Sequence, residues 1–206
     1  LLAQTYELHH WYEQCENKDT SLSYLFEMLY PNKYLQQRLE TAIIDDTKLS
    51  DDASAELRSI RQKITRSGLK IRETLVKMIK SPSTQKYLQE SIVTMRDGRF
   101  VLPVKTEFKG NVSGLVHDTS ATGSTLFIEP MSVVEANNDI RILQGQEQDE
   151  IHRIIAEFSM ECAEMKDQLI SNYNAVTELN LYFAKANLGA KMSCLLYTSP
   201  SPRDTR

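Results

Sequence analysis

The sequence predicts a mainly α-helical protein in which a small antiparallel β-island interrupts a long antiparallel helical stalk. Two long segments with helical spacing of apolar residues flank a short stretch, residues 97–130, in which strand-like runs alternate with turn residues. The second helical segment, at about 55 residues, would be about 80 Å long, which a globule of this size cannot enclose. We therefore expect the two long helices to pair as a lever or coiled coil, with the β-rich insertion at or near the tip.

Residues 1–45 are expected to form helices with breaks, within a helical core part predicted over residues 1–50. Leu22, Leu25 and Leu29 recur at helical spacing. Pro31 marks a restart, because proline is tolerated in the first turn of a helix but not in its interior. The apolar stripe then continues as far as about residue 45.

The outgoing lever is predicted over residues 51–90, with one long helix from about Asp52 to Lys80. Its apolar positions recur on average every ~3.5 residues, the period of a coiled-coil seam. Gly68 lies in the middle of this seam and should weaken it by about 1 kcal/mol relative to alanine. Pro82 ends the helix, because proline disfavours α geometry in the residue before it. The seam residues are Leu57, Ile60, Ile64, Gly68, Ile71, Leu75 and Met78.

A β-rich, clamp-like insertion is predicted over residues 91–133. Asp97-Gly98 lies between two apolar runs and predicts a tight hairpin, since a type I′ turn needs positive φ at both central residues. A second hairpin is expected from Gly114 to Ile128, with a reversal at Ser-Ala-Thr-Gly-Ser. Pro103 cannot donate to a ladder, so its strand should lie at a sheet edge or carry a bulge.

The return lever is predicted over residues 134–192 as one long helix with an apolar edge. The helical pattern stops after Met192, and residues 193–206 contain two prolines within a Ser/Thr cluster. We expect this tail to be non-native or disordered, because it resembles translated sequencing-adapter sequence and has the composition of a linker. The chain begins with Leu1, so we expect it to start inside a longer protein.

The composition is that of an ordinary folded protein, with 41% hydrophobic residues, 25% charged residues and a net charge of −4. No apolar run reaches the roughly 18–20 residues that a bilayer span requires, and the N-terminus lacks the basic start of a signal peptide. Three cysteines lie far apart in the sequence, which favours a reducing compartment. We therefore expect a cytoplasmic protein without membrane contact.

The modest net charge conceals two oppositely charged segments. The segment from Arg58 to Lys109 contains thirteen basic residues and only four acidic ones. The segment from Glu135 to Asp167 contains nine acidic residues and three basic ones. Attraction between the paired helices accounts for part of this asymmetry. A positive track for a phosphate backbone accounts for it as well, and the two explanations are compatible.

No constellation of catalytic residues emerges from the sequence. His117, Asp118, Glu129 and Glu135 are of the types that bind metals or transfer protons, but their spacing matches no standard site. We expect a structural role for them, with Asp118 bonding nearby turn amides. The chain contains no G-x-x-x-x-G-K-[ST] phosphate loop and no C-x-x-C pair. We therefore expect no catalytic residue, metal site or cofactor site in this segment.

Three stretches, GRFVLPVK, GLVHDTSATGSTLFIEP and VVEANN, together resemble the second bacterial subfamily of MutS proteins. These are paralogues of the mismatch-repair MutS proteins and usually carry a C-terminal Smr domain. The resemblance is continuous from about Thr41 to about Met192. It implies a fragment that covers the core, lever and clamp region and lacks the ATPase domain of the family.

The resemblance further implies a function. The segment would be the nucleic-acid-binding lever and clamp of a MutS-like ATPase that acts on mismatched or recombining DNA or on stalled ribosomes. The intact protein would be a cytoplasmic homodimer that uses ATP and Mg in its ATPase domain, with the Smr domain as endonuclease. Its partners would be duplex or branched DNA or ribosomal RNA, and the fragment itself would be non-catalytic.

Four basic residues are the predicted nucleic-acid contacts, because they lie in the β-island, where the stalk's own charges do not require them: Arg96, Arg99, Lys105 and Lys109. The alternative is a structural coiled-coil module whose β-island docks onto another protein or domain. That alternative rests on the apolar content of the island, namely Phe100, Val101, Leu102, Leu126, Phe127 and Ile128.

Overall fold

The computed structural model describes residues 1–192, which form two compact units. The stalk unit comprises Thr41–Ala156, and the helical unit comprises Leu1–Glu40 together with the described residues from Glu157 onward. The predicted tail, residues 193–206, lies outside the described residues. None of the helices in the described part combines the length and apolar character that a bilayer crossing requires.

The helical unit is held together by contacts of the first two helices with the last one. Tyr12 stacks on Phe26 with ring centroids 4.5 Å apart, and both pack against Leu179. The buried side chain of Asn172 accepts a hydrogen bond from the Tyr30 amide at 2.7 Å and donates one to the Tyr30 carbonyl at 2.9 Å. The elements are α1 (Leu2–Glu13), α2 (Ser23–Glu27), α3 (Lys33–Ala42), which ends in the stalk unit, and α7 (Lys166–Lys191).

The predicted helices with breaks are confirmed as far as Ala42, and the helical prediction is wrong beyond it. A small hairpin follows instead, made of β1 (Ile43–Asp45) and β2 (Lys48–Leu49). Ile43 and Ile44 are β-branched and favour strand geometry. The Asp45 carboxylate accepts from the amide and the hydroxyl of Thr47, at 2.8 and 2.7 Å, and so closes the turn.

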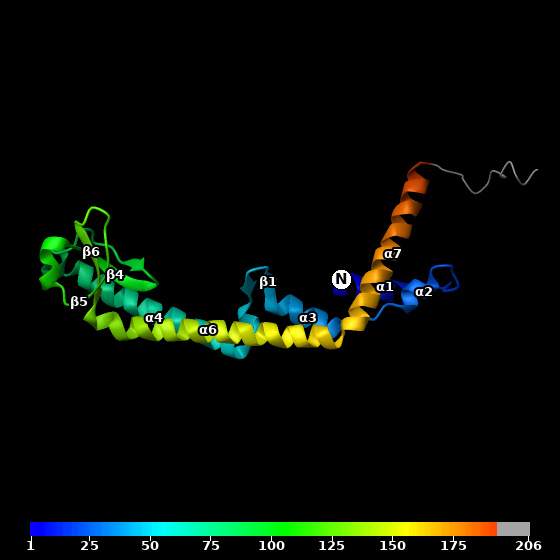
Figure 1. The fold of residues 1–206 in the computed structure, drawn as a ribbon, viewed down its shortest axis with the longest axis horizontal. Coiled ribbons are helices and arrows are strands. Elements are labelled where there is room, and N and C mark those ends of the chain that lie inside the picture. The colour runs from blue at the N-terminus through cyan, green and yellow to red at the C-terminus, as the bar shows by residue number, and fades with distance from the viewer. Residues whose placement is uncertain (193–206) are drawn as a thin grey trace, which may run out of the picture. The chain divides into compact units, whose positions relative to one another are not determined.

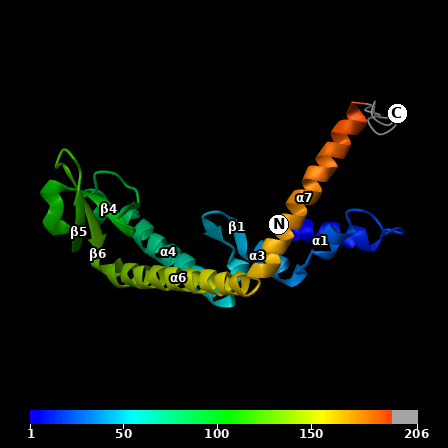
Figure 2. The ribbon, with the colours of Figure 1, turned by 45° about the vertical axis from the view of Figure 1, so that its right-hand side comes forward.

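In the stalk unit, α4 (Ala55–Lys80) runs antiparallel to the first part of α6 (Met131–Glu164), as Figures 1 and 2 both show. The Ser54 hydroxyl, before the start of α4, donates to Glu150 at 2.7 Å. Arg61 pairs with Glu147 at 2.7 Å. At the other end of α4, Met78 accepts from the hydroxyl of Ser132 at 3.6 Å. The predicted antiparallel stalk is therefore confirmed.

The ends of α4 follow local rules. Ser54 caps its start, because its side chain accepts a hydrogen bond from the Leu57 amide at 2.9 Å. Ser81 ends it in an extended conformation, and Pro82 then occupies the first turn of α5 (Pro82–Gln85). The predicted stop at Ser81-Pro82 is confirmed.

The β-island is a four-stranded antiparallel sheet in the order β3-β4-β6-β5. Its strands are β3 (Thr94–Arg96), β4 (Arg99–Lys105), β5 (Gly114–Thr119) and β6 (Thr125–Pro130), and a 3-10 turn, η2 (Thr106–Asn111), joins β4 to β5. Asp97 and Gly98 have φ of 49° and 74°, so the type I′ signal is confirmed. The second predicted hairpin is confirmed as β5–β6.

One face of the sheet packs against both helices of the stalk. Leu102 lies opposite Ile128, and Val104 lies opposite Leu126, so these four side chains share a face. They form one core with the second half of the α4 seam and the start of α6. The buried members contributed by the helices are Ile71, Leu75, Val133 and Ile140. The apolar seam of α4 therefore packs against both α6 and the four-stranded sheet.

The prediction that the Pro103 strand lies at an edge or carries a bulge is wrong. β4 is a central strand, and its register with β6 is regular through Pro103. The pairing of β4 with β3 ends at Val101, however, and the Pro103 carbonyl then accepts from the Gln89 amide at 2.9 Å. In an antiparallel strand the nitrogen and the carbonyl of one residue point to the same side, which for Pro103 is the side of β3. Because β3 has already ended there, the missing N–H of Pro103 leaves no hydrogen bond of the sheet unmade.

The return lever is two helices rather than the single long one that was predicted. α6 ends at Glu164 and α7 begins at Lys166. Between them Met165 has φ −95° and ψ 14°, which departs from helical geometry. The apolar spacing continues through Cys162, Met165 and Leu169, so the periodicity carried no sign of this break.

Gly68 provides a test of the seam. An ideal Cβ at Gly68 would lie 3.7 Å from the Phe100 ring, which is ordinary van der Waals contact. We predict that Gly68→Ala raises the free energy of unfolding by up to about 1 kcal/mol, because alanine has the higher helix propensity. Urea unfolding followed by circular dichroism measures the change. Gly68→Val is the contrast, since its branched side chain meets the ring; equal stabilisation by both variants would contradict the packing.

The pH dependence of stability gives a second test. The guanidinium of Arg153, followed by the Ser54 hydroxyl, lowers the pKa of Glu150 to about 2 from its ordinary 4.5. This depressed pKa contributes stability above about pH 4.5 that is lost as the pH falls toward 2. We expect Glu150→Gln to be less stable than the parent chain at pH 6, and the difference to shrink between pH 4.5 and 2. A difference that is constant over this range would exclude the ion pair as its cause.

Candidate nucleic-acid interface

The four predicted contact residues lie in or near the two ends of β4. Arg96 and Arg99 flank the Asp97-Gly98 turn and are partners in the β3–β4 register. Lys105 ends the strand, and Lys109 follows in η2. Because seven extended residues span about 20 Å, the structure brings the four together as two separate pairs.

Arg99 makes its contacts inside the protein. Its guanidinium donates to both carboxylate oxygens of Glu129, at 2.9 and 3.0 Å, and to Asn138 at 2.7 Å. The Arg99 side chain is 15% exposed, and that of Glu129 is 0% exposed. This geometry makes Arg99 the counter-charge of a buried acid, which leaves little of its guanidinium for an external phosphate.

Glu129 is the centre of this network. Its carboxylate also contacts His117 Nε2 and accepts from the side-chain amide of Asn137 at 2.7 Å. Asn137 in turn bonds the backbone amide and carbonyl of Phe100, both at 3.2 Å. One carboxylate therefore connects β4, β5 and β6 with the first turns of α6. Sequence reasoning missed the Arg99–Glu129 pair, because the two residues lie 30 positions apart on different strands.

The structural interpretation of the acidic cluster is confirmed for the residues that the sheet brings together. His117 and Glu129 contact each other, and Asp118 accepts from the Thr119 amide at 2.7 Å. Glu135 is exposed on α6 and belongs to no such group. Within residues 1–192, no three His, Cys, Asp or Glu side chains are placed to hold a metal ion.

Arg96 lies on the face of the sheet that carries Pro103 and Phe127. Its guanidinium carbon lies 3.9 Å from the centroid of the Phe127 ring, and its Nε lies 3.3 Å from the Asp118 carboxylate. It borders an open depression of about 280 Å³ that is also lined by Gln89, Glu90, Ile92, Thr94, Pro103, Ser120, Thr125 and Phe127. Arg96 is accessible there, but part of its charge is compensated by Asp118.

The two lysines are the more available pair. Lys105 is half-buried, with its ammonium 6.0 Å from the centroid of the Phe108 ring. Lys109 is exposed and makes no ion pair with any described residue. A neighbouring acid, Glu107, is also exposed. The sheet therefore offers two lysines at one end and a partly compensated arginine at the other.

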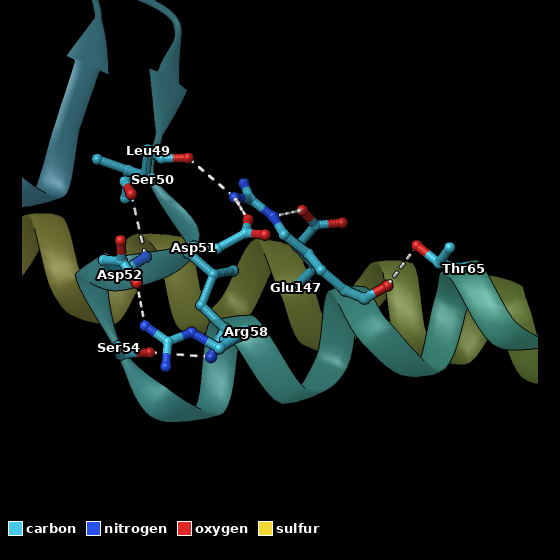
Figure 3. A network of polar contacts seen from close by, with 10 residues as sticks. Leu49, Ser50, Asp51, Asp52, Ser54, Arg58, Thr65 and Glu147 are labelled. Atoms are coloured by element: carbon cyan, nitrogen blue, oxygen red, sulfur yellow. Dashed lines mark hydrogen bonds and ion pairs between the residues drawn. The ribbon is translucent and has the colours of Figure 1, made fainter.

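At the start of α4 the basic residues are compensated by nearby acids, as Figure 3 shows. Arg58 pairs with Asp52. Arg61 donates to the Leu49 carbonyl at 2.9 Å and pairs with Asp51 at 2.6 Å, in addition to its pair with Glu147 of α6. The predicted attraction between the paired helices is thus present at Arg61. The basic residues farther along α4 are exposed instead.

The chain is similar to curated proteins named Endonuclease MutS2. It is 44% identical over 180 residues to the one from Ruminiclostridium cellulolyticum, a match that covers 87% of this chain and 23% of the relative. The protein from Alkaliphilus oremlandii is 47% identical over 160 residues, 78% of this chain and 20% of the relative. The protein from Clostridioides difficile is 44% identical over 168 residues, 82% of this chain and 21% of the relative.

The chain thus spans about a fifth of the length of the curated relatives that it matches. No protein-family model matches it.

The buried network can be tested by removing its centre. We predict that Glu129→Ala lowers the free energy of unfolding by about 3–5 kcal/mol, because it leaves the Arg99 guanidinium without its internal partner. Glu135→Ala, an exposed acid on α6, serves as the control and should change stability by less than about 0.5 kcal/mol. Chemical denaturation of both variants gives the comparison. If the two variants were equally stable, the network would not be what holds the sheet to α6.

Proposed function

Because this chain belongs to the MutS2 family, we propose that it is the lever and clamp of a MutS-like protein that binds duplex nucleic acid. One observation carries the proposal: basic residues outnumber acids thirteen to four between Arg58 and Lys109, a segment that includes an exposed helix face and the end of the sheet. Cations in such an arrangement contact phosphates and give affinity without sequence specificity.

The stalk supports a mechanical role. Two antiparallel helices with a shared apolar seam resist bending, and the sheet is fixed to both of them through a common core and through Glu129. A movement of the stalk would therefore carry the sheet with it as a rigid body. We propose that this lever couples the grip on nucleic acid to conformational changes elsewhere in the protein.

We propose that the chemistry of the whole protein is carried out by parts other than this segment. The chain contains no phosphate-loop sequence, so none of the steps proposed for it uses ATP. By its likeness to proteins named endonucleases, we propose a nuclease activity for the whole protein. From the resemblance of its sequence to the MutS family, we further propose that the whole protein is a homodimeric ATPase. Its target would be mismatched or branched DNA, or ribosomal RNA on stalled ribosomes.

The alternative of a protein-docking island loses its main support. Val101, Leu102 and Ile128 are buried in the island itself, and Leu126 is 7% exposed. Phe100 packs against the same core, and Phe127 lies under the Arg96 guanidinium. The apolar residues on which the docking alternative was based thus pack inside the stalk unit or under Arg96, and so offer little surface to a protein partner.

The test is a charge reversal on the sheet. We predict that the triple variant Arg96→Glu, Lys105→Glu and Lys109→Glu weakens binding of the chain to a 20-base-pair duplex. The slope of log K against log salt should fall in magnitude by about 3, one for each lost phosphate contact. Fluorescence anisotropy across a salt titration measures both quantities. Arg99 stays unchanged, because a glutamate there would face the Glu129 carboxylate in the interior.

The matched control is Lys166→Glu, Lys185→Glu and Lys191→Glu, three exposed lysines of α7. It makes the same change in net charge, and its effect should be small. Equal binding by the sheet variant and the parent chain at every salt concentration, with unchanged circular dichroism, would refute the clamp assignment.

A further inference from the structure

The outer face of α4 carries a row of five basic side chains that we call the α4 stripe. Its members are exposed, and none makes an ion pair with any residue in the described part of the chain. They are Lys63, Arg66, Lys70, Lys77 and Lys80. This is the largest group of uncompensated charge that α4 presents to solvent.

The stripe is straight. At 3.6 residues per turn, its five members fall within an arc of about 100° on the helix. The buried residues Leu57, Ile60, Ile71 and Leu75 occupy the side turned away from it. From Lys63 to Lys80 the stripe extends for about 25 Å, since each helical residue rises about 1.5 Å. One acid, the exposed Glu73, interrupts it.

The stalk's own stability does not require the stripe. The ion pair between α4 and α6 is made by Arg61, on a different side of the helix. Because stripe residues repel one another at three- and four-residue separations, they cost the helix a few tenths of a kcal/mol per pair. A bound anionic partner would offset this repulsion between the stripe residues.

Two kinds of anionic partner fit poorly. A helix that lies on a lipid surface needs an apolar face beside its cations, and the apolar face of α4 is buried in the stalk. A protein interface needs buried apolar or aromatic anchors. The exposed large apolar side chain of α4 is Leu69, at 58% exposure, a single residue beside the stripe.

A phosphate backbone needs neither an exposed apolar face nor apolar anchors. It is a regular line of negative charges that remains partly hydrated when bound. Lys63, Lys70 and Lys77 are seven residues apart, so their ammonium groups repeat at about 10 Å. Lysine is a flexible point charge that adapts to phosphate positions without reading bases.

We infer that the α4 stripe is a contact track for the phosphate backbone of duplex nucleic acid, which lies along the helix. The inference rests on the proposed function and extends the contact surface from the end of the sheet along the exposed face of α4. It assigns binding to residues that are distinct from the four predicted on the β-island. The track spans about 25 Å, or roughly 7 base pairs at 3.4 Å per pair.

The experiment uses the complete chain with fluorescein-labelled 20-base-pair DNA and RNA duplexes. The stripe variant is Lys63→Glu, Lys70→Glu and Lys77→Glu, and the matched control is the α7 triple variant Lys166→Glu, Lys185→Glu and Lys191→Glu. We expect the stripe variant to bind at least about tenfold more weakly at low salt, with a salt slope smaller by about 3. A loss with both duplexes identifies general backbone recognition, and a loss with one identifies the helix form that the track accepts.

A second variant acts in the opposite direction. Glu73→Lys removes the one acid of the stripe and should tighten binding and raise the salt slope by about 1. Since this change relieves no buried contact, a gain cannot come from altered folding. Parent-like binding by both the stripe variant and Glu73→Lys, in a chain that binds duplex through its sheet lysines, would overturn the inference and leave the proposed function standing. A parent chain that binds neither duplex at any salt concentration would overturn the proposed function itself.

Discussion

The buried carboxylate of Glu129 is the constraint on which the stalk unit depends. A charge with no exposure to solvent is tolerated only when it is paired and hydrogen-bonded. The Glu129 carboxylate pairs with Arg99, contacts His117 and accepts a hydrogen bond from Asn137. These partners come from β4, β5 and α6, so the charge is satisfied only when the sheet has its correct register and lies against the helix. Apolar packing of the buried face disfavours a shifted register, and this directional network adds a second penalty for any shift. The position of the sheet on the stalk is thereby fixed.

Ion pairing inside the protein divides the basic residues of the segment into two groups. Arg99 and Arg61 serve the structure, the first inside the sheet and the second between α4 and α6. The lysines of the sheet end and of the outer face of α4 have no such duty among the described residues. Charge counted along the sequence cannot make this division, because it depends on which acids come close in space. The polyanion-binding surface we propose is what remains after internal pairing.

The sequence predicted most of the architecture where the signals are local. Asp97-Gly98 specifies a turn by its own backbone preferences, and Ser81-Pro82 ends a helix by a steric clash with the preceding residue. The failures arise where distant contacts decide. Pro103 lies in a central strand because β3 is short, and Met165 interrupts a helix whose apolar spacing is continuous. The site was predictable as a basic region, but the burial of Arg99 was not, since it requires knowledge of the β4–β6 pairing.

The repeat that pairs the helices also aligns the outer charges. A seam with a period of about 3.5 residues keeps one side of α4 against its neighbours along the whole helix. A second set of residues placed at the same period then forms a line parallel to the seam, as Lys63, Lys70 and Lys77 do at intervals of seven. A helix with a drifting seam would spread those charges around its circumference. The rigid pairing of the stalk helices and the straight row of charges on α4 therefore both follow from the seven-residue repeat of this helix. Because the row is straight, it can contact a polyanion along its whole length.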